Sequence, residues 1–188
     1  MKLVRESLEP LFEIGEANVQ TYKISYLGKL KEWEGSDVSD YIMIGYEFLT
    51  EDKDKYIVTF LPIGKTQIIK GKVFNVRVDF LVSGVHPSKL INKGRIFKVF
   101  STICVIIKDY LKRNPQTFSI VIIPGKTEEG EETRFKLYQK YVESQMGSEW
   151  RSILLDNSKS EREYESSQII QLLNDQKFND YKAIKKPD

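Results

Sequence analysis

Residues 94–124, GRIFKVFSTICVIIKDYLKRNPQTFSIVIIP, contain the clearest structural pattern in the sequence. Apolar residues first recur every three or four positions, which predicts a helix over residues 95–113. Asn114-Pro115 ends this helix, because the residue before a proline disfavours helical backbone. The continuous apolar run over residues 118–123 is typical of a strand that is covered on both faces. This stretch therefore predicts a helix that packs on a sheet and leads into a buried strand.

Four strand-like segments precede the helix. Alternating apolar residues, or groups of aromatic and β-branched residues, mark them at residues 19–27, 41–49, 55–63 and 72–82. The links after the second and third segments are short, so we expect antiparallel neighbours there. The strand, helix, strand order between residues 72 and 123 predicts a parallel pair, or at least a helix packed across the sheet.

Further segments follow the buried run. A second helix is predicted to begin near Glu131 or Thr133, with Tyr138 among its inward-facing residues. Residues 148–156 have the pattern of a last strand or of a short helix. Together these segments predict an α/β or α+β fold with a mainly antiparallel sheet, formed as one domain by residues 1–156.

The last part of the chain, residues 157–188, is predicted to be a linker followed by a C-terminal helix. Residues 157–167 are polar and have the composition of a linker. Residues 166–182 predict an amphipathic helix, which either packs back on the domain or binds a protein partner or a second copy of the chain. The apolar residues of this helix are Ile169, Ile170, Leu172 and Leu173, with Phe178 and Tyr181 further on.

The composition excludes several classes of protein. The chain has 188 residues, of which 40% are hydrophobic and 12% aromatic, so a packed core is expected. The 29 basic and 27 acidic residues give a net charge of +2, which makes nucleic acid an unfavoured partner. Cys104 is the only cysteine, so an internal disulfide is excluded. No segment has the roughly 18 to 20 apolar residues of a membrane span, and we expect a protein without membrane contact.

Polar residues outside the helix give no catalytic signature. Nucleotide-binding glycine motifs, a nucleophile elbow and a histidine cluster are all missing from the sequence. His86 is the only histidine, and the acidic run at residues 128–132 lacks the spacing of a calcium loop, so we expect no metal site. Arg77 and Asp79 lie on the polar face of the fourth strand, where they either line a cleft or, as we favour, face solvent.

A basic turn precedes the predicted helix. Its members are Lys89, Lys93, Gly94, Arg95 and Lys98. Free backbone N–H groups and the helix dipole favour anions at a helix N-terminus, so a phosphate group is one candidate ligand. The alternative is an ordinary exposed turn, because lysine and arginine are common on such turns.

Residues 74–142 resemble the core of the GNAT acetyltransferase superfamily. The segments NKGR, the helix from Arg95, FSIVII and RFKLYQKY follow that family's order of strand, basic turn, long helix, strand and second helix. The resemblance implies that Lys93, Gly94 and Arg95 bind the pyrophosphate of acetyl-CoA and that Tyr138 protonates the leaving thiolate. Ile96 stands where the family has a second small residue, and its side chain would crowd a pyrophosphate that approaches the backbone closely.

A second resemblance is to small proteins of tailed phages and mobile elements. It is carried by Phe100-Ser101-Thr102, by Asp109-Tyr110-Leu111 and by residues 134–140. These motifs are set by packing, so the resemblance implies no catalytic residue. Arg134 and Tyr138 are four residues apart and lie on one helix face, where they either act together or pack against the sheet.

These patterns together favour a non-enzymatic accessory or interaction protein of phage type, on an acetyltransferase-like scaffold without a cofactor. Such a protein would reside in the host cytoplasm or in the virion, and its partner contacts would include Arg134 and the C-terminal helix. The alternative is an N-acetyltransferase that uses acetyl-CoA. Weak binding of nucleic acid by the basic turn is a third hypothesis.

Overall fold

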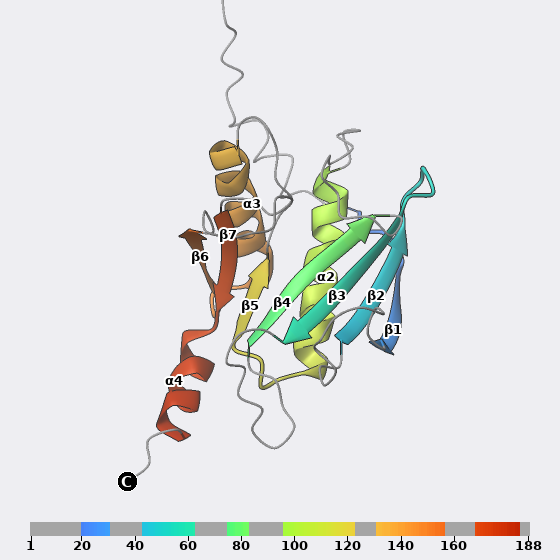
Figure 1. The fold of residues 1–188 in the computed structure, drawn as a ribbon. Helices are drawn as coiled ribbons and strands as arrows, with labels where there is room; N and C mark the ends of the chain where they lie inside the picture. Colours follow the sequence, from blue (N-terminus) through green and yellow to red (C-terminus); the bar gives the residue numbers. More distant parts are fainter. Residues whose placement is uncertain are drawn as a thin grey trace, which may run out of the picture.

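The computed structural model describes residues 20–30, 43–62, 75–82, 96–122, 131–156 and 168–184. These residues form a mixed α+β fold with one seven-stranded sheet in the order β1-β2-β3-β4-β5-β7-β6 (Figure 1). The strands are β1 Ile24–Leu30, β2 Met43–Leu49, β3 Lys55–Pro62, β4 Asn75–Val82, β5 Ser119–Ile122, β6 Arg151–Asp156 and β7 Gln168–Leu173. The helices are α2 Ile96–Arg113, α3 Glu131–Met146 and α4 Asp175–Ile184.

One strand pair differs from all the others in this sheet. β4 and β5 are parallel, whereas the remaining neighbours pair antiparallel. α2 connects β4 to β5, so the predicted parallel pair across a helix is confirmed. The expectation of a mainly antiparallel sheet is confirmed as well.

α2 forms because one stripe of its surface is continuously apolar. Its residues Ile103, Ile106 and Ile107 are at most 2% exposed and pack into the main core. Lys112 and Arg113 lie in the last turn, where the negative end of the helix dipole favours cations. The helix ends as predicted at Asn114, whose side-chain amide donates to the carbonyl of Tyr110 at 2.9 Å.

The C-terminal half of α2 is joined to the first two strands by polar and aromatic contacts. Asp109 accepts hydrogen bonds from the hydroxyl of Tyr46 in β2 at 2.9 Å and from Nε of Arg113 at 2.7 Å. The Arg113 guanidinium also lies 4.4 Å from the centroid of the Tyr26 ring in β1. These contacts fix one end of the helix across the sheet.

Most buried side chains belong to a single core. α2 and α3 both contribute to it, with Tyr141 and Val142 from α3, and the sheet contributes residues such as Val78 and Ile120. α4 belongs to a smaller cluster, in which Phe178 packs near Phe118 and Leu173. Within the described part of the chain, no helix is long and apolar enough to cross a membrane.

The prediction of a helix over residues 166–182 was wrong for its first half. Residues Gln168–Leu173 form β7, which lies between β5 and β6 in the sheet, and only Asp175–Ile184 are helical. Periodicity cannot separate a short apolar strand from a buried helical segment, and the strand is chosen here by pairing with β5 and β6. Residues 148–156, left open between strand and helix, contain strand β6.

The expectation that Arg77 faces solvent was also wrong. Arg77 is only 9% exposed, and its neighbours on the same face of β5, Ser119 and Val121, are 1% and 5% exposed. This part of the sheet is therefore covered on both faces. An alternating pattern normally marks a strand with one solvated face, which is why the prediction failed.

Candidate functional site

The candidate site lies at the end of the sheet where β4 ends and α2 begins (Figure 1). The ladder between β4 and β5 runs from the pair Asn75 and Ser119 to the pair Val78 and Ile122. β4 continues to Val82 and remains paired with β3 over this length. The residues that follow Ile122 lie outside the described ones, so the described ladder covers residues 75–78 of β4.

Figure 1 shows that β4 leans away from β5 toward its C-terminal end. α2 starts at this same end, because a helix that joins two parallel strands must run back along them. In open sheets with parallel strands, ligands characteristically bind beyond the carboxyl ends of the strands. The carboxyl ends of β4 and β5, where the two strands diverge, therefore form the candidate ligand site.

The sequence-predicted cofactor residues are located only in part. Lys93, Gly94 and Arg95 lie outside the described residues. Arg134 and Tyr138 belong to the first half of α3, but their side chains lie outside the described ones. The structure thus gives the order of these residues along the chain, and their side-chain contacts lie outside the described part.

The predicted partner contacts of the C-terminal segment lie in β7. The side chain of Ile169 is outside the described ones, whereas Ile170, Leu172 and Leu173 are 1%, 0% and 7% exposed. Ile170 and Leu172 pack into the main core, and Leu173 packs near Phe118. Burial within the sheet accounts for the apolar character of these three residues.

α3 contacts α2 through Tyr141, one turn after Tyr138. The Tyr141 hydroxyl and Ser101 Oγ form a buried hydrogen bond, and the Tyr141 ring lies 5.8 Å from the ring of Phe97. Burial raises the pKa of the Tyr141 phenol, and the hydrogen bond to Ser101 opposes this shift. The phenol therefore stays neutral and ties α3 to the N-terminal half of α2.

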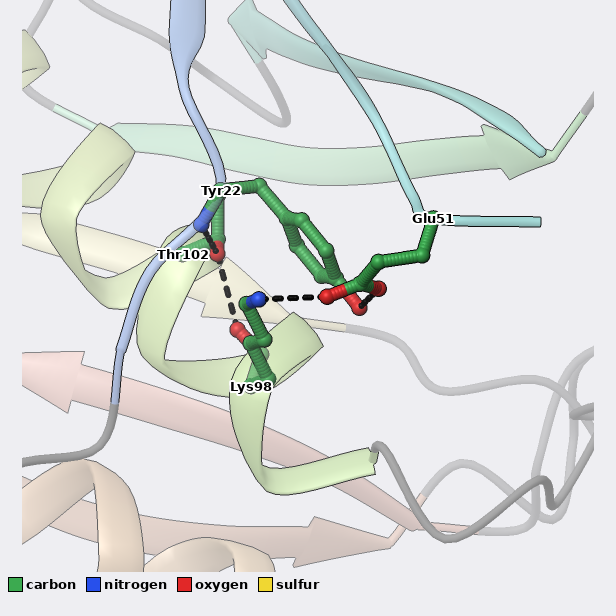
Figure 2. Close-up of polar contacts among 4 residues, drawn as sticks. All are labelled: Tyr22, Glu51, Lys98 and Thr102. Atoms are coloured by element: carbon green, nitrogen blue, oxygen red, sulfur yellow. Dashed lines mark hydrogen bonds and ion pairs between the residues drawn. The ribbon is translucent and has the colours of Figure 1, made fainter. Parts of the chain in front are cut away.

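On the opposite side, four residues from three segments form what we call the α2 clamp (Figure 2): Tyr22, Glu51, Lys98 and Thr102. Tyr22 precedes β1, Glu51 follows β2, and Lys98 and Thr102 lie in the first half of α2. No local sequence pattern indicates this cluster, because its central ion pair joins residues 47 positions apart.

Glu51 is the centre of the α2 clamp. One of its carboxylate oxygens accepts from Lys98 Nζ at 2.5 Å, and the other accepts from the Tyr22 hydroxyl at 2.7 Å (Figure 2). These hydrogen bonds, first from Lys98 and then from Tyr22, lower the pKa of the Glu51 carboxyl from 4.5 to about 2. Glu51 is therefore ionised at neutral pH.

Thr102 closes the α2 clamp on the helix. Its hydroxyl accepts from the backbone N–H of Tyr22 at 2.9 Å and donates to the carbonyl of Lys98 at 2.7 Å. The Tyr22 ring stacks on Phe48 with centroids 5.5 Å apart, and Lys98 Nζ lies 4.4 Å from the Tyr22 centroid. The segment before β1 is thus bound to α2 by main-chain, side-chain and aromatic contacts.

This arrangement changes the interpretation of the basic turn. Lys98 is its one member with a described side chain, and its ammonium is paired with Glu51 rather than directed at a ligand. The Lys98 side chain is 23% exposed and the Glu51 side chain 46%. Any anion bound at the start of α2 therefore depends on backbone N–H groups or on other members of the turn.

The described residues give no support for a metal site or for a reactive thiol. Among the described residues, no group of three or more His, Cys, Asp or Glu side chains is placed to hold a metal ion. Cys104 is 1% exposed, and burial raises the pKa of its thiol to about 12. A buried neutral thiol is a poor nucleophile, so Cys104 is a packing residue.

Neither a scan of the sequence against family models nor a search of curated proteins found a match.

Proposed function

We propose that this chain is an acetyltransferase-type domain that binds acetyl-CoA where β4 and β5 diverge, at the carboxyl end of β4. The observation that carries the proposal is the β4–β5 pair, which is the parallel pair of this sheet and in which β4 leans away from β5 toward its C-terminal end (Figure 1). At the carboxyl ends of two diverging strands, backbone N–H and C=O groups that face the opening are not needed for strand pairing. Such groups can hydrogen-bond the amides of an extended ligand such as the pantetheine arm of acetyl-CoA.

The order of elements supports the same proposal. The resemblance to GNAT acetyltransferases implies a strand, a long helix, a strand and a second helix, and β4, α2, β5 and α3 follow in that order. In this proposal the start of α2, with Lys93, Gly94 and Arg95 before it, holds the pyrophosphate. Tyr138 in α3 donates a proton to the leaving thiolate of CoA.

A non-enzymatic role, as an accessory or interaction protein of phage type, is the second candidate. The observation that favours it is the pairing of Lys98 with Glu51, which removes one cation from the turn that would hold a pyrophosphate. The same pairing weakens the basic patch on which nucleic-acid binding would depend. In this second proposal the scaffold persists without its cofactor and serves a protein partner.

Calorimetric titration with acetyl-CoA separates the two candidates. We expect a dissociation constant in the micromolar range for the wild-type chain, and Arg95→Glu should weaken it by about tenfold or more, because a charge contact to phosphate is replaced by repulsion. Lys112→Glu is the matched control, since Lys112 is an exposed cation in the last turn of α2, at the other end of the helix. Absence of binding by the wild-type chain would reject the acetyl-CoA proposal in favour of the second candidate.

Catalysis is tested on the same protein. Tyr138→Phe should lower the rate of acetyl transfer to a panel of primary amines while leaving the dissociation constant of acetyl-CoA unchanged, because only the proton donor is lost. Tight binding of acetyl-CoA without transfer to any amine in wild type would leave a cofactor-binding domain and reject the assignment to Tyr138.

A further inference from the structure

We propose that the residues of the α2 clamp are positioning residues, which hold the first turns of α2 in place for the ligand, and that Lys98 does not itself bind the ligand. This inference rests on the proposed acetyl-CoA site. It adds residues that lie before β1, after β2 and in α2 to a site built around β4 and β5. The proposal follows from how the first half of α2 is held on its two sides.

On the side of β1 and β2, the α2 clamp contacts both the backbone and the side chains of the helix. Thr102 binds the backbone of Tyr22 and the carbonyl of Lys98, so the helix is joined to the segment before β1. Glu51 binds the side chain of Lys98, so the helix is also joined to the turn after β2. Two separate segments of the chain therefore fix the same two turns of α2.

On the side of α3, Tyr141 holds the same turns of the helix. Its hydroxyl bonds to Ser101 and its ring packs near Phe97, and both residues lie within one turn of Lys98. The first half of α2 is thus held between α3 and the α2 clamp. Because binding sites lose affinity when their groups are displaced by fractions of an ångström, the position of these turns controls the fit of a ligand.

Lys98 has two partners that account for its position. Its ammonium is bonded to Glu51 and lies over the ring of Tyr22, which also stacks on Phe48. A phosphate at this ammonium would compete with the Glu51 carboxylate for its charge. The positive charge of Lys98 is therefore paired with groups of the protein itself.

The two roles of Lys98 predict opposite results for Glu51→Gln. If Lys98 were a phosphate ligand, loss of the Glu51 charge would free its ammonium and strengthen binding of a polyanionic cofactor. If Lys98 is a positioning residue, the same variant loosens the first turns of α2 and weakens binding. The sign of the change in affinity therefore decides between the roles.

The experiment titrates acetyl-CoA into wild type, Glu51→Gln and Tyr22→Phe. We expect both variants to bind about three- to tenfold more weakly, the range typical of substitutions that act on a site through its support. Glu47→Gln is the matched control. Glu47 pairs with Lys55 at 2.6 Å across β2 and β3, so this substitution removes the same charge at a place away from α2. Unchanged or tighter binding by Glu51→Gln would overturn the positioning role.

Hydrogen exchange, measured by mass spectrometry without any ligand, keeps this inference separate from the proposed function. In Glu51→Gln and Tyr22→Phe we expect faster exchange in a peptide over residues 98–104, with a peptide over residues 106–113 unchanged. If both variants exchanged at the wild-type rate in both halves of α2, the positioning role of the α2 clamp would be overturned, even if acetyl-CoA binds. If wild type fails to bind acetyl-CoA, the proposed function falls and the exchange result alone decides whether these residues position α2.

Discussion

Removal of residues 157–188 should unfold the protein, because this deletion takes β7 out of the sheet. β7 lies between β5 and β6, and among the described strands it is the sheet partner of β6. Ile170, Leu172 and Leu173 are each at least 93% buried. Replacing one buried leucine or isoleucine by alanine costs about 2–5 kcal/mol, so loss of all three side chains removes on the order of 6–15 kcal/mol. A domain has about 5–15 kcal/mol in total, so the shortened chain has no stability left.

The assay is urea unfolding followed by far-ultraviolet circular dichroism. The chain that ends at Asp156 should show no cooperative transition. A cooperative transition with wild-type midpoint would refute the reasoning, since β7 would then contribute nothing to the core.

A point variant tests the same strand without deletion. Leu172→Ala should lower the free energy of unfolding by about 2–5 kcal/mol, because the residue is 0% exposed. Leu155→Ala in β6 is the matched control, since this leucine is 36% exposed and its truncation should cost roughly 1 kcal/mol or less. Equal losses for the two variants would contradict the burial of β7.

Three further predictions concern single residues elsewhere in the fold. Gly45→Val should destabilise the sheet, because a Cβ at Gly45 would lie 2.8 Å from Cγ of Leu30, and a lowered melting temperature for this variant checks it. Cys104 should resist iodoacetamide in the folded protein and react after denaturation, as measured by mass spectrometry, since its thiol is buried and its pKa is about 12. The pKa of Glu51 is lowered from 4.5 to about 2, so the stability that its charge contributes is present above pH 4.5 and is lost as the pH falls toward 2. The difference in unfolding midpoint between wild type and Glu51→Gln should shrink over that interval, and a constant difference would contradict the ion pair.

Local patterns predicted the elements that depend on local residues. The sequence predicts this helix at residues 95–113, and α2 is found at Ile96–Arg113. The agreement is close because neighbouring residues determine both the apolar stripe and the end at Asn114-Pro115. The second helix begins at Glu131, one of the two predicted positions. Helical periodicity and helix ends depend on residues close together in the chain, so both can be recognised in one sequence without an alignment.

Features that depend on distant residues were missed. β7 is a strand because residues 119–122 and 151–156 lie on either side of it, and neither neighbour is visible from its own six residues. The burial of Arg77 depends in the same way on what covers the second face of β4 and β5. The ion pair of Glu51 with Lys98 spans 47 positions, so the local sequence contains no sign that the charge of Lys98 is paired with a distant carboxylate.

The most direct test of the acetyl-CoA site is an NMR titration of the isotope-labelled protein that follows backbone amides. We predict that acetyl-CoA shifts the amide signals of residues 79–82 in β4 and of the first turn of α2, and leaves those of α4 unchanged. The divergence of β4 from β5 toward its C-terminal end is the reason for this expectation (Figure 1). Absence of shifts, or shifts confined to α4, would contradict a cofactor site at the end of β4.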